Sequence, residues 1–359
     1  RRKRQIDKGW PDQRPHCANR AQFLETWAAT QYVGDVASCN DLADPILNGD
    51  RSALARAITL IESRRAGDAH AAEELLSKLL PDSGKAIRIG ITGAPGVGKS
   101  TLIETLGMQL CNAGAKLAVL AVDPSSSVTG GSILGDKTRM DELSRHANAF
   151  IRPSPGGNTL GGVAGRTQEA MILCEAAGHD TVLIETIGTG QSEIAVHGMV
   201  DFFLVMLSPA AGDELQGIKR GVMELADGVL VHKADGDLLP AANRTAQQCM
   251  LAMRVLHSDE QEPPRVLVGS SVSHDGIPEL WQYIEQHIAQ RKQNGLFEKR
   301  RSQQALEWLN RTVRDSLLDE LTASPNAKAE FAAAQSRVAE GKQVATAAAR
   351  DLIRRCQQR

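Results

Sequence analysis

The sequence has few aromatic residues, no large excess of positive or negative charge and no long apolar runs. Each of these absences excludes a class of function. Aromatic residues make up only 3% of the 359 residues, too few for the stacking surface on which proteins bind single-stranded nucleic acid. Acidic and basic residues number 43 and 41, so no overall positive field favours nucleic acid or an anionic membrane. No apolar run approaches the roughly 20 residues of a membrane-spanning helix.

Clustered cysteines are also missing. None of the six forms a C-x-x-C pair, which suits a reducing compartment and disfavours a disulfide or zinc framework. We therefore expect a cytoplasmic protein, or a mitochondrial matrix protein if the source is eukaryotic. The scattered positions are Cys17, Cys39, Cys111, Cys174, Cys249 and Cys356.

The middle of the chain alternates between short β-rich runs and helical patterns. This alternation predicts an α/β fold in which helices cover both faces of a mostly parallel sheet. The expected strands are residues 87–91, 117–122, 149–151, 181–184, 202–207, 229–231 and 266–268.

The flanking regions differ from this middle part. Residues 1–45 have no sustained periodicity, and we expect a poorly ordered extension there. Apolar residues at helical spacing after the N-cap candidate Asp50 predict N-terminal helices over 46–84. The nucleotide domain is expected over 85–298 and a wholly helical arm over 299–359. Such an arm has no sheet of its own, so it must pack on the main domain or on another subunit.

One motif stands directly after the first predicted strand and at the start of a predicted helix. It matches the phosphate-binding pattern G-x-x-x-x-G-K-[ST] in the structural context that the pattern requires. Its glycines let successive N–H groups point at phosphate oxygens, and the helix N-terminus adds its dipole. We expect Lys99 to reach the β- and γ-phosphates and Ser100 to bind Mg²⁺. The loop residues are Gly93, Ala94, Pro95, Gly96, Val97, Gly98, Lys99, Ser100 and Thr101.

Two carboxylates follow apolar strands and are candidate ligands for Mg²⁺, which prefers oxygen donors. Asp123 ends one strand, and Glu185 ends another and opens an acidic-x-x-Gly pattern. Parallel strands end at the edge of the sheet where ligands bind. Gly188 is the candidate N–H donor to the γ-phosphate, and Asp136 lies in a glycine-rich loop that suits a switch.

A third segment carries the candidate base contacts. His232, Lys233 and Asp235 follow an apolar strand where GTPases carry N-K-x-D. An aspartate there accepts from guanine N1 and N2 hydrogens that adenine does not offer, which favours GTP over ATP. The imidazole in place of asparagine can donate to guanine N7 or brace the loop. The candidate second base loop follows another strand and comprises Ser270, Ser271 and Val272.

Several long stretches carry a family resemblance. The segments 123–140, 185–193 and 212–221 resemble the MeaB/ArgK-type GTPases, G-protein chaperones of methylmalonyl-CoA mutase formerly described as amino-acid transport ATPases. The resemblance runs from about residue 50 to the C-terminus. It implies a homodimer with a C-terminal dimerisation arm. It also implies that the protein gates adenosylcobalamin loading into the mutase and protects that enzyme.

The resemblance further implies roles for particular residues. Lys99, Asp123, Asp136 and Glu185 are expected to form the nucleotide–Mg²⁺ centre. Gln216 and Lys219 are expected in a third switch loop that couples nucleotide state to the mutase. Two residues depart from the family pattern: His232 stands where asparagine is usual, and Thr189 replaces a valine in the second switch. Because Thr189 directly follows Gly188, no positioning glutamine is evident, and we expect slow turnover that a partner accelerates.

The same motifs are compatible with other functions. A nickel-enzyme maturation GTPase shares the fold class, although the nine histidines and six cysteines here do not cluster. An ATP-dependent kinase or a transport-associated ATPase would use the same phosphate loop. A dimeric scaffold could hold nucleotide without hydrolysing it. Nothing resembles the D-x-H-x-x-G signature of a cobalamin-binding protein.

Overall fold

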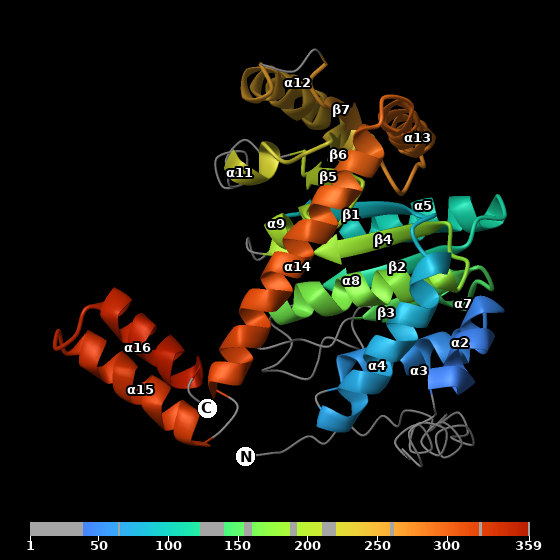
Figure 1. Ribbon diagram of the computed structural model, residues 1–359. Coiled ribbons are helices and arrows are strands. Elements are labelled where there is room, and N and C mark those ends of the chain that lie inside the picture. The colour runs from blue at the N-terminus through green and yellow to red at the C-terminus, as the bar shows by residue number, and fades with distance from the viewer. Residues whose placement is uncertain are drawn as a thin grey trace, which may run out of the picture. The chain divides into compact units, whose positions relative to one another are not determined.

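A seven-stranded sheet forms the centre of the computed structural model (Figure 1), which describes residues 39–63, 65–122, 140–153, 160–186, 192–209, 220–258, 262–322 and 325–357. The strand order is β3-β2-β4-β1-β5-β6-β7, and every neighbouring pair is parallel. All seven predicted strands are present, so the predicted parallel α/β sheet is confirmed. The strands are β1 (Ile87–Gly93), β2 (Leu117–Val122), β3 (Ala149–Pro153), β4 (Thr181–Thr186), β5 (Phe202–Leu207), β6 (Gly228–Val231) and β7 (Arg265–Val268).

Helices connect and cover these strands. No helix in the described ranges is both long and apolar enough to cross a bilayer. The helices are α2 (Cys39–Leu47), α3 (Arg51–Glu62), α4 (Ala66–Leu79), α5 (Lys99–Asn112), α7 (Asp141–Arg145), α8 (Leu160–Ala176), α9 (Ser192–His197), α11 (Arg220–Met223), α12 (Leu239–Leu256), α13 (Ile277–Gln293), α14 (Leu296–Thr322), α15 (Pro325–Ala339) and α16 (Ala345–Gln357), with 3₁₀ turns η1 (Leu80–Asp82) and η2 (Gly236–Leu238).

The central strand β1 shows how both faces of the sheet are covered. Ile89 and Ile91 are fully buried and belong to a core cluster with α5 and α13. Successive side chains of a strand point to opposite faces, so Gly90 faces the other side. A Cβ at Gly90 would lie 2.8 Å from a methyl group of Val196 in α9. The glycine therefore lets α9 pack closely on the second face.

The N-terminal helices begin earlier than predicted. Asp50 caps α3, accepting hydrogen bonds from the amides of Ser52 (2.7 Å) and Ala53 (3.1 Å), which confirms its predicted role. However, α2 begins at Cys39 and buries Leu42, so the expectation of an extension up to residue 45 is wrong for its last seven positions. Pro45 lies inside this short helix. Because proline disfavours helix interiors, the sequence does not indicate a helix here.

The C-terminal helices also differ from the prediction. Helix α14 starts directly after Gly295, which has φ 72°, so the expected boundary at 298 falls inside a helix. The arm expected over 299–359 is helical, as predicted, and its last part is divided into two helices, α15 and α16. Gly341 between them has φ 70°, in the left-handed region where glycine commonly ends helices.

Two successive arginines attach α14 to the amino ends of the strands. Arg301 donates from Nε and Nη2 to the two carboxylate oxygens of Asp201, at 2.8 and 2.6 Å. Arg300 donates from Nη1 to both oxygens of Asp227, at 3.1 and 3.2 Å. Asp201 directly precedes β5 and Asp227 directly precedes β6, and both are buried. The first turns of α14 are therefore joined to the sheet by charged hydrogen bonds.

Candidate functional site

The phosphate-binding motif forms the connection between the central strand β1 and helix α5. Gly96 and Gly98 adopt φ 80° and 102°, a left-handed conformation that residues with side chains rarely adopt. At Gly93 a Cβ would lie 2.6 Å from the carbonyl oxygen of Met206. Lys99 is 7% exposed, and its ammonium donates to the Gly93 carbonyl at 2.9 Å. This turn, followed by a helix N-terminus and a lysine, is an arrangement that can bind a phosphate.

Two oxygen-bearing side chains lie together beside this loop. The Ser100 hydroxyl donates to Glu185 Oε1 at 3.0 Å. Glu185 lies near the carboxyl end of β4, paired with Ile91 of β1, so the sheet register brings it to the loop. A hydroxyl and a carboxylate are donors that Mg²⁺ accepts. The other predicted residues of this region, Asp123, Asp136, Gly188, Gln216 and Lys219, lie outside the described residues.

A threonine pair at the same edge was not predicted. The Thr186 hydroxyl donates to the Thr92 hydroxyl at 2.8 Å, and both side chains are buried. The pair joins the carboxyl ends of β1 and β4 just before the phosphate loop and just after Glu185. Its signal in the sequence is a threonine near the end of each of two apolar strands. Only the pairing of those strands shows that the two threonines meet.

The predicted base-contacting residues gather at the carboxyl ends of β6 and β7. Lys233 has φ 58°, an uncommon conformation for a residue other than glycine. Its ammonium donates to the Gly96 carbonyl at 2.6 Å, so its stem lies against the phosphate loop. The Asp235 carboxylate accepts a hydrogen bond from the Ser270 hydroxyl. Ser270 Oγ in turn accepts from the amide of Val272 at 3.1 Å. The two loops are therefore connected to each other and to the phosphate loop.

His232 makes the most buried of these connections. Its side chain is 3% exposed, with Nδ1 2.9 Å from the Val97 carbonyl oxygen and Nε2 2.7 Å from Ser271 Oγ. Because a carbonyl can only accept, Nδ1 carries the hydrogen and Nε2 accepts from the Ser271 hydroxyl. A Cβ at Gly98 would lie 2.6 Å from Nδ1. These contacts make the imidazole a brace between the loops.

Acid is expected to break this brace. Burial lowers the pKa of His232, and the hydrogen bond to Val97 only partly offsets that effect. The unfolded state therefore binds more protons below the ordinary histidine pKa of about 6.5. By linkage, the stabilisation is complete above that pH and is lost as the pH falls through the lower folded pKa. We expect the free energy of unfolding and the GTP affinity to fall more steeply between pH 7 and pH 5 in the unsubstituted protein than in His232→Asn.

Denaturant unfolding and nucleotide titration at several pH values would measure both quantities. Asparagine offers one donor and one acceptor but does not titrate in this range. If the free energy of unfolding and the GTP affinity depended on pH equally in the unsubstituted protein and in His232→Asn, His232 would not be the titrating group. His179→Asn is the control for the nucleotide titration: this histidine is partly buried and also has a lowered pKa, but it bonds to Cys174, so its replacement should leave the pH dependence of GTP affinity unchanged.

The sheet order, with a glycine-rich loop between β1 and α5, defines a P-loop nucleotide hydrolase. A model of the family described as "Methylmalonyl Co-A mutase-associated GTPase MeaB" matches residues 54–326. The chain belongs to this family of GTPases.

Individual relatives agree with this assignment. A Mycobacterium tuberculosis protein named as a GTPase is 49% identical over 314 residues, which cover 87% of this chain and 93% of that protein. The mouse protein named methylmalonic aciduria type A homolog, mitochondrial, is 43% identical over 82% of this chain and 74% of its own length. A solved structure described as an LAO/AO transport system kinase aligns with a TM-score of 0.72 and 34% identity, over 90% of this chain and 99% of that one.

Proposed function

We propose that this GTPase is a G-protein chaperone that gates adenosylcobalamin loading into an acyl-CoA mutase of the methylmalonyl-CoA mutase type and protects that enzyme. The observation that carries the proposal is the family match, because the family is described as mutase-associated. The mouse relative, named for methylmalonic aciduria, supports the same client. The joined phosphate and base-contacting loops at one edge of the sheet supply the nucleotide-dependent part.

Nucleotide binding is assigned to residues 93–101 at the phosphates and to the loops after β6 and β7 at the base. Lys99 would place its charge on the β- and γ-phosphates. Ser100 and Glu185 would hold Mg²⁺ together with Asp123 and Asp136. The 3.0 Å contact between the Ser100 and Glu185 oxygens supports this donor set. When bound, Mg²⁺ would neutralise charge on the phosphate oxygens.

Base selection is assigned to Asp235. Its carboxylate is oriented by the Ser270 hydroxyl and retains lone pairs for the guanine N1 and N2 hydrogens. The bond between Lys233 and Gly96 keeps this loop next to the phosphate loop. His232 acts as a positioning residue through Val97 and Ser271. Hydrolysis then proceeds by in-line attack of water on the γ-phosphate, slowly until the client accelerates it.

The test combines both activities of the proposed chaperone. Steady-state GTP hydrolysis would be measured with and without a purified methylmalonyl-CoA mutase, alongside transfer of adenosylcobalamin to that mutase. We expect kcat to rise when the mutase is added, and transfer to depend on GTP but not on ATP. The chaperone role would be rejected if the mutase did not change the turnover rate and the nucleotide did not change the transfer yield. The GTPase assignment would still stand in that case.

The homodimer is proposed from the surface of α14. Leu306, Leu309, Val313 and Leu317 are 61%, 57%, 49% and 55% exposed. Their spacing of three and four residues places them in one stripe along the helix. Burying such a stripe against a second subunit would remove apolar area from water at about 25 cal/mol per Å².

Introducing charge into this stripe is expected to separate the subunits. In the double variant Leu309→Asp with Leu317→Asp, dimer formation would require burying carboxylates in an apolar interface. We expect sedimentation velocity to show a monomer at concentrations where the unsubstituted chain is a dimer. Arg314→Asp, on the same helix but off the stripe, serves as the control and should stay dimeric. Unchanged dimers in the double variant would place the interface elsewhere.

A further inference from the structure

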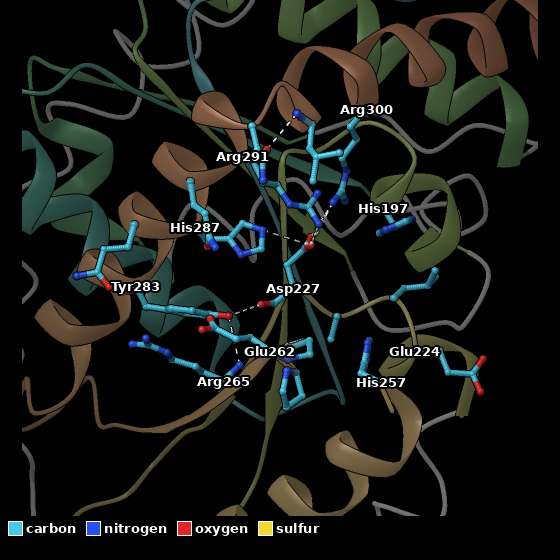
Figure 2. Close-up of a pocket in the computed structure, with 18 residues that line it drawn as sticks. His197, Glu224, Asp227, His257, Glu262, Arg265, Tyr283, His287, Arg291 and Arg300 are labelled. Atoms are coloured by element: carbon cyan, nitrogen blue, oxygen red, sulfur yellow. Dashed lines mark hydrogen bonds and ion pairs between the residues drawn. The ribbon is translucent and has the colours of Figure 1, made fainter. Parts of the chain in front are cut away.

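A cavity of about 1000 Å³ lies at the edge of the sheet opposite the phosphate loop. Figure 2 shows the side chains that line it. Asp227 lies in its wall and directly precedes β6, whereas His232 follows the other end of the same strand. Because neighbouring strands are parallel, the cavity and the base-contacting loops are on opposite edges. The cavity is therefore not part of the nucleotide site.

The Asp227 carboxylate is fully satisfied by hydrogen bonds and ion pairs. Its carboxylate accepts from the Phe203 amide at 2.9 Å and from Arg300 at 3.1 Å. Arg291 Nη2 and His287 Nε2 lie 3.4 and 3.5 Å from Oδ1. Burial alone would raise the pKa of Asp227, but the contacts with His287, Arg300 and Arg291 hold the pKa well below its usual range. The carboxylate therefore stays ionised.

The surrounding cations exceed this one carboxylate. Figure 2 shows Arg291, Arg300 and His287 directed toward Asp227, so two permanent positive charges face a single negative one. Arg300 Nη2 is buried and has no hydrogen-bond partner among the described residues. Leaving a buried charged donor unpaired is costly, and such a group commonly marks a bound ion or water. The inner wall of the cavity therefore has more guanidinium donors than hydrogen-bond acceptors to pair with them.

The outer wall adds a cation and neutral hydrogen-bonding groups. The guanidinium of Arg265 lies 5.1 Å from the centre of the Tyr283 ring, and within the described ranges it forms no ion pair. The remaining acids of the lining, Glu224 and Glu262, are exposed, so water screens their charge. The buried part of the lining therefore has more cations than acids, and the exposed part holds Arg265 together with two acids that water screens.

We propose that this cavity binds a small molecule through a phosphate or carboxylate group placed against Arg291 and Arg300. Guanidinium groups bind both anions with paired, charge-assisted hydrogen bonds. The volume is within the range of small-molecule sites. Gln286, Gln290 and Asn294 also line the cavity and offer donors and acceptors for the rest of such a molecule. This inference goes beyond the proposed function and does not depend on the identity of the client.

The site lies between helix α14 and the start of strand β6. Arg300 belongs to α14, and Asp227 leads into β6. An anion that takes a hydrogen bond from Arg300 Nη2 would share this guanidinium with Asp227, which is held by Nη1. A bound molecule would therefore touch both the C-terminal arm and the strand that ends in the base-contacting segment.

Calorimetric titration of the full chain tests the proposal. The protein is first saturated with GDP and Mg²⁺ so that the phosphate loop is occupied, and is then titrated with inorganic phosphate or succinate at constant ionic strength. We expect saturable binding of at least one probe at one site per chain, and the stronger probe identifies the anion class. In Arg291→Gln the affinity should fall roughly tenfold, the value of one charge-assisted hydrogen bond.

Matched variants make the result decisive. Lys292→Gln removes a charge at the next position, where the ammonium lies over Phe297 outside the cavity lining, and should leave probe affinity unchanged. Arg265→Gln alters an exposed side chain, so it tests the site even if Arg291→Gln is poorly folded. Absence of saturable binding by both probes overturns the proposal. Equal affinity in the unsubstituted protein, Arg291→Gln and Arg265→Gln also overturns it, because binding would then lie elsewhere.

Discussion

GTP hydrolysis by Lys99→Ala is expected to be roughly 100- to 1,000-fold slower than hydrolysis by the unsubstituted chain, the range seen when one preorganised charge-stabilising group is removed. Lys99 begins α5, and its buried ammonium is held against the carbonyl of Gly93 at 2.9 Å. A phosphate group bound in the same turn would meet that charge directly. Alanine keeps the helix but removes the only side-chain cation of the loop.

Single-turnover measurements at saturating GTP and Mg²⁺ would separate this loss of rate from a loss of binding. Lys85→Ala is the matched control, because Lys85 is an exposed lysine just before β1 and should have normal activity. If Lys99→Ala retained both normal affinity and normal turnover, the phosphate site assigned to residues 93–101 would be wrong.

The second large effect is expected on base selection. In Asp235→Ala the affinity for GTP should fall about 100-fold, since two hydrogen bonds to a charged acceptor are lost. The affinity for ATP should change little, because adenine has no donors at the corresponding positions. The preference for guanine would therefore disappear mainly through weaker GTP binding. The Ser270 hydroxyl also loses its acceptor in this variant.

Competition titrations with GTP, GDP and ATP would measure this preference. Asp237→Ala, an exposed aspartate two residues further along, is the control and should keep the guanine preference. An equal loss of affinity for GTP and ATP in Asp235→Ala would indicate damage to the loop. The direct contact with the base would then have to be assigned to another residue.

The features predicted well from the sequence are those encoded locally. Strands such as 202–207 are continuous apolar runs, which is the pattern of strands buried on both faces. The phosphate loop has fixed residue types at fixed spacing, so its place between β1 and α5 follows from the motif alone. The Asp50 cap is equally local, because its hydrogen bonds reach only two and three residues ahead.

The features that could not be predicted depend on residues far apart in the chain. His232 joins Val97 and Ser271, which are 135 and 39 residues away. In the sequence this imidazole is only a departure from asparagine, and its two partners follow from the way the sheet places β1, β6 and β7 beside one another. The cavity also lacks a local pattern, because Asp227 and Arg300 are 73 residues apart. Roles for Asp123 and Asp136 remain predictions.

The attachment of α14 through Arg300 and Arg301 bears on how the chain can be divided. Severing it at residue 298 would remove both guanidiniums and leave Asp201, whose side chain is 1% exposed, without its bidentate partner. Breaking a buried ion pair in this way costs about 3–5 kcal/mol, a large part of the roughly 5–15 kcal/mol that stabilises a typical domain. A shortened protein should therefore keep α14 and end near Thr322. The smallest autonomously folding GTPase then includes much of the segment that the sequence assigns to the arm.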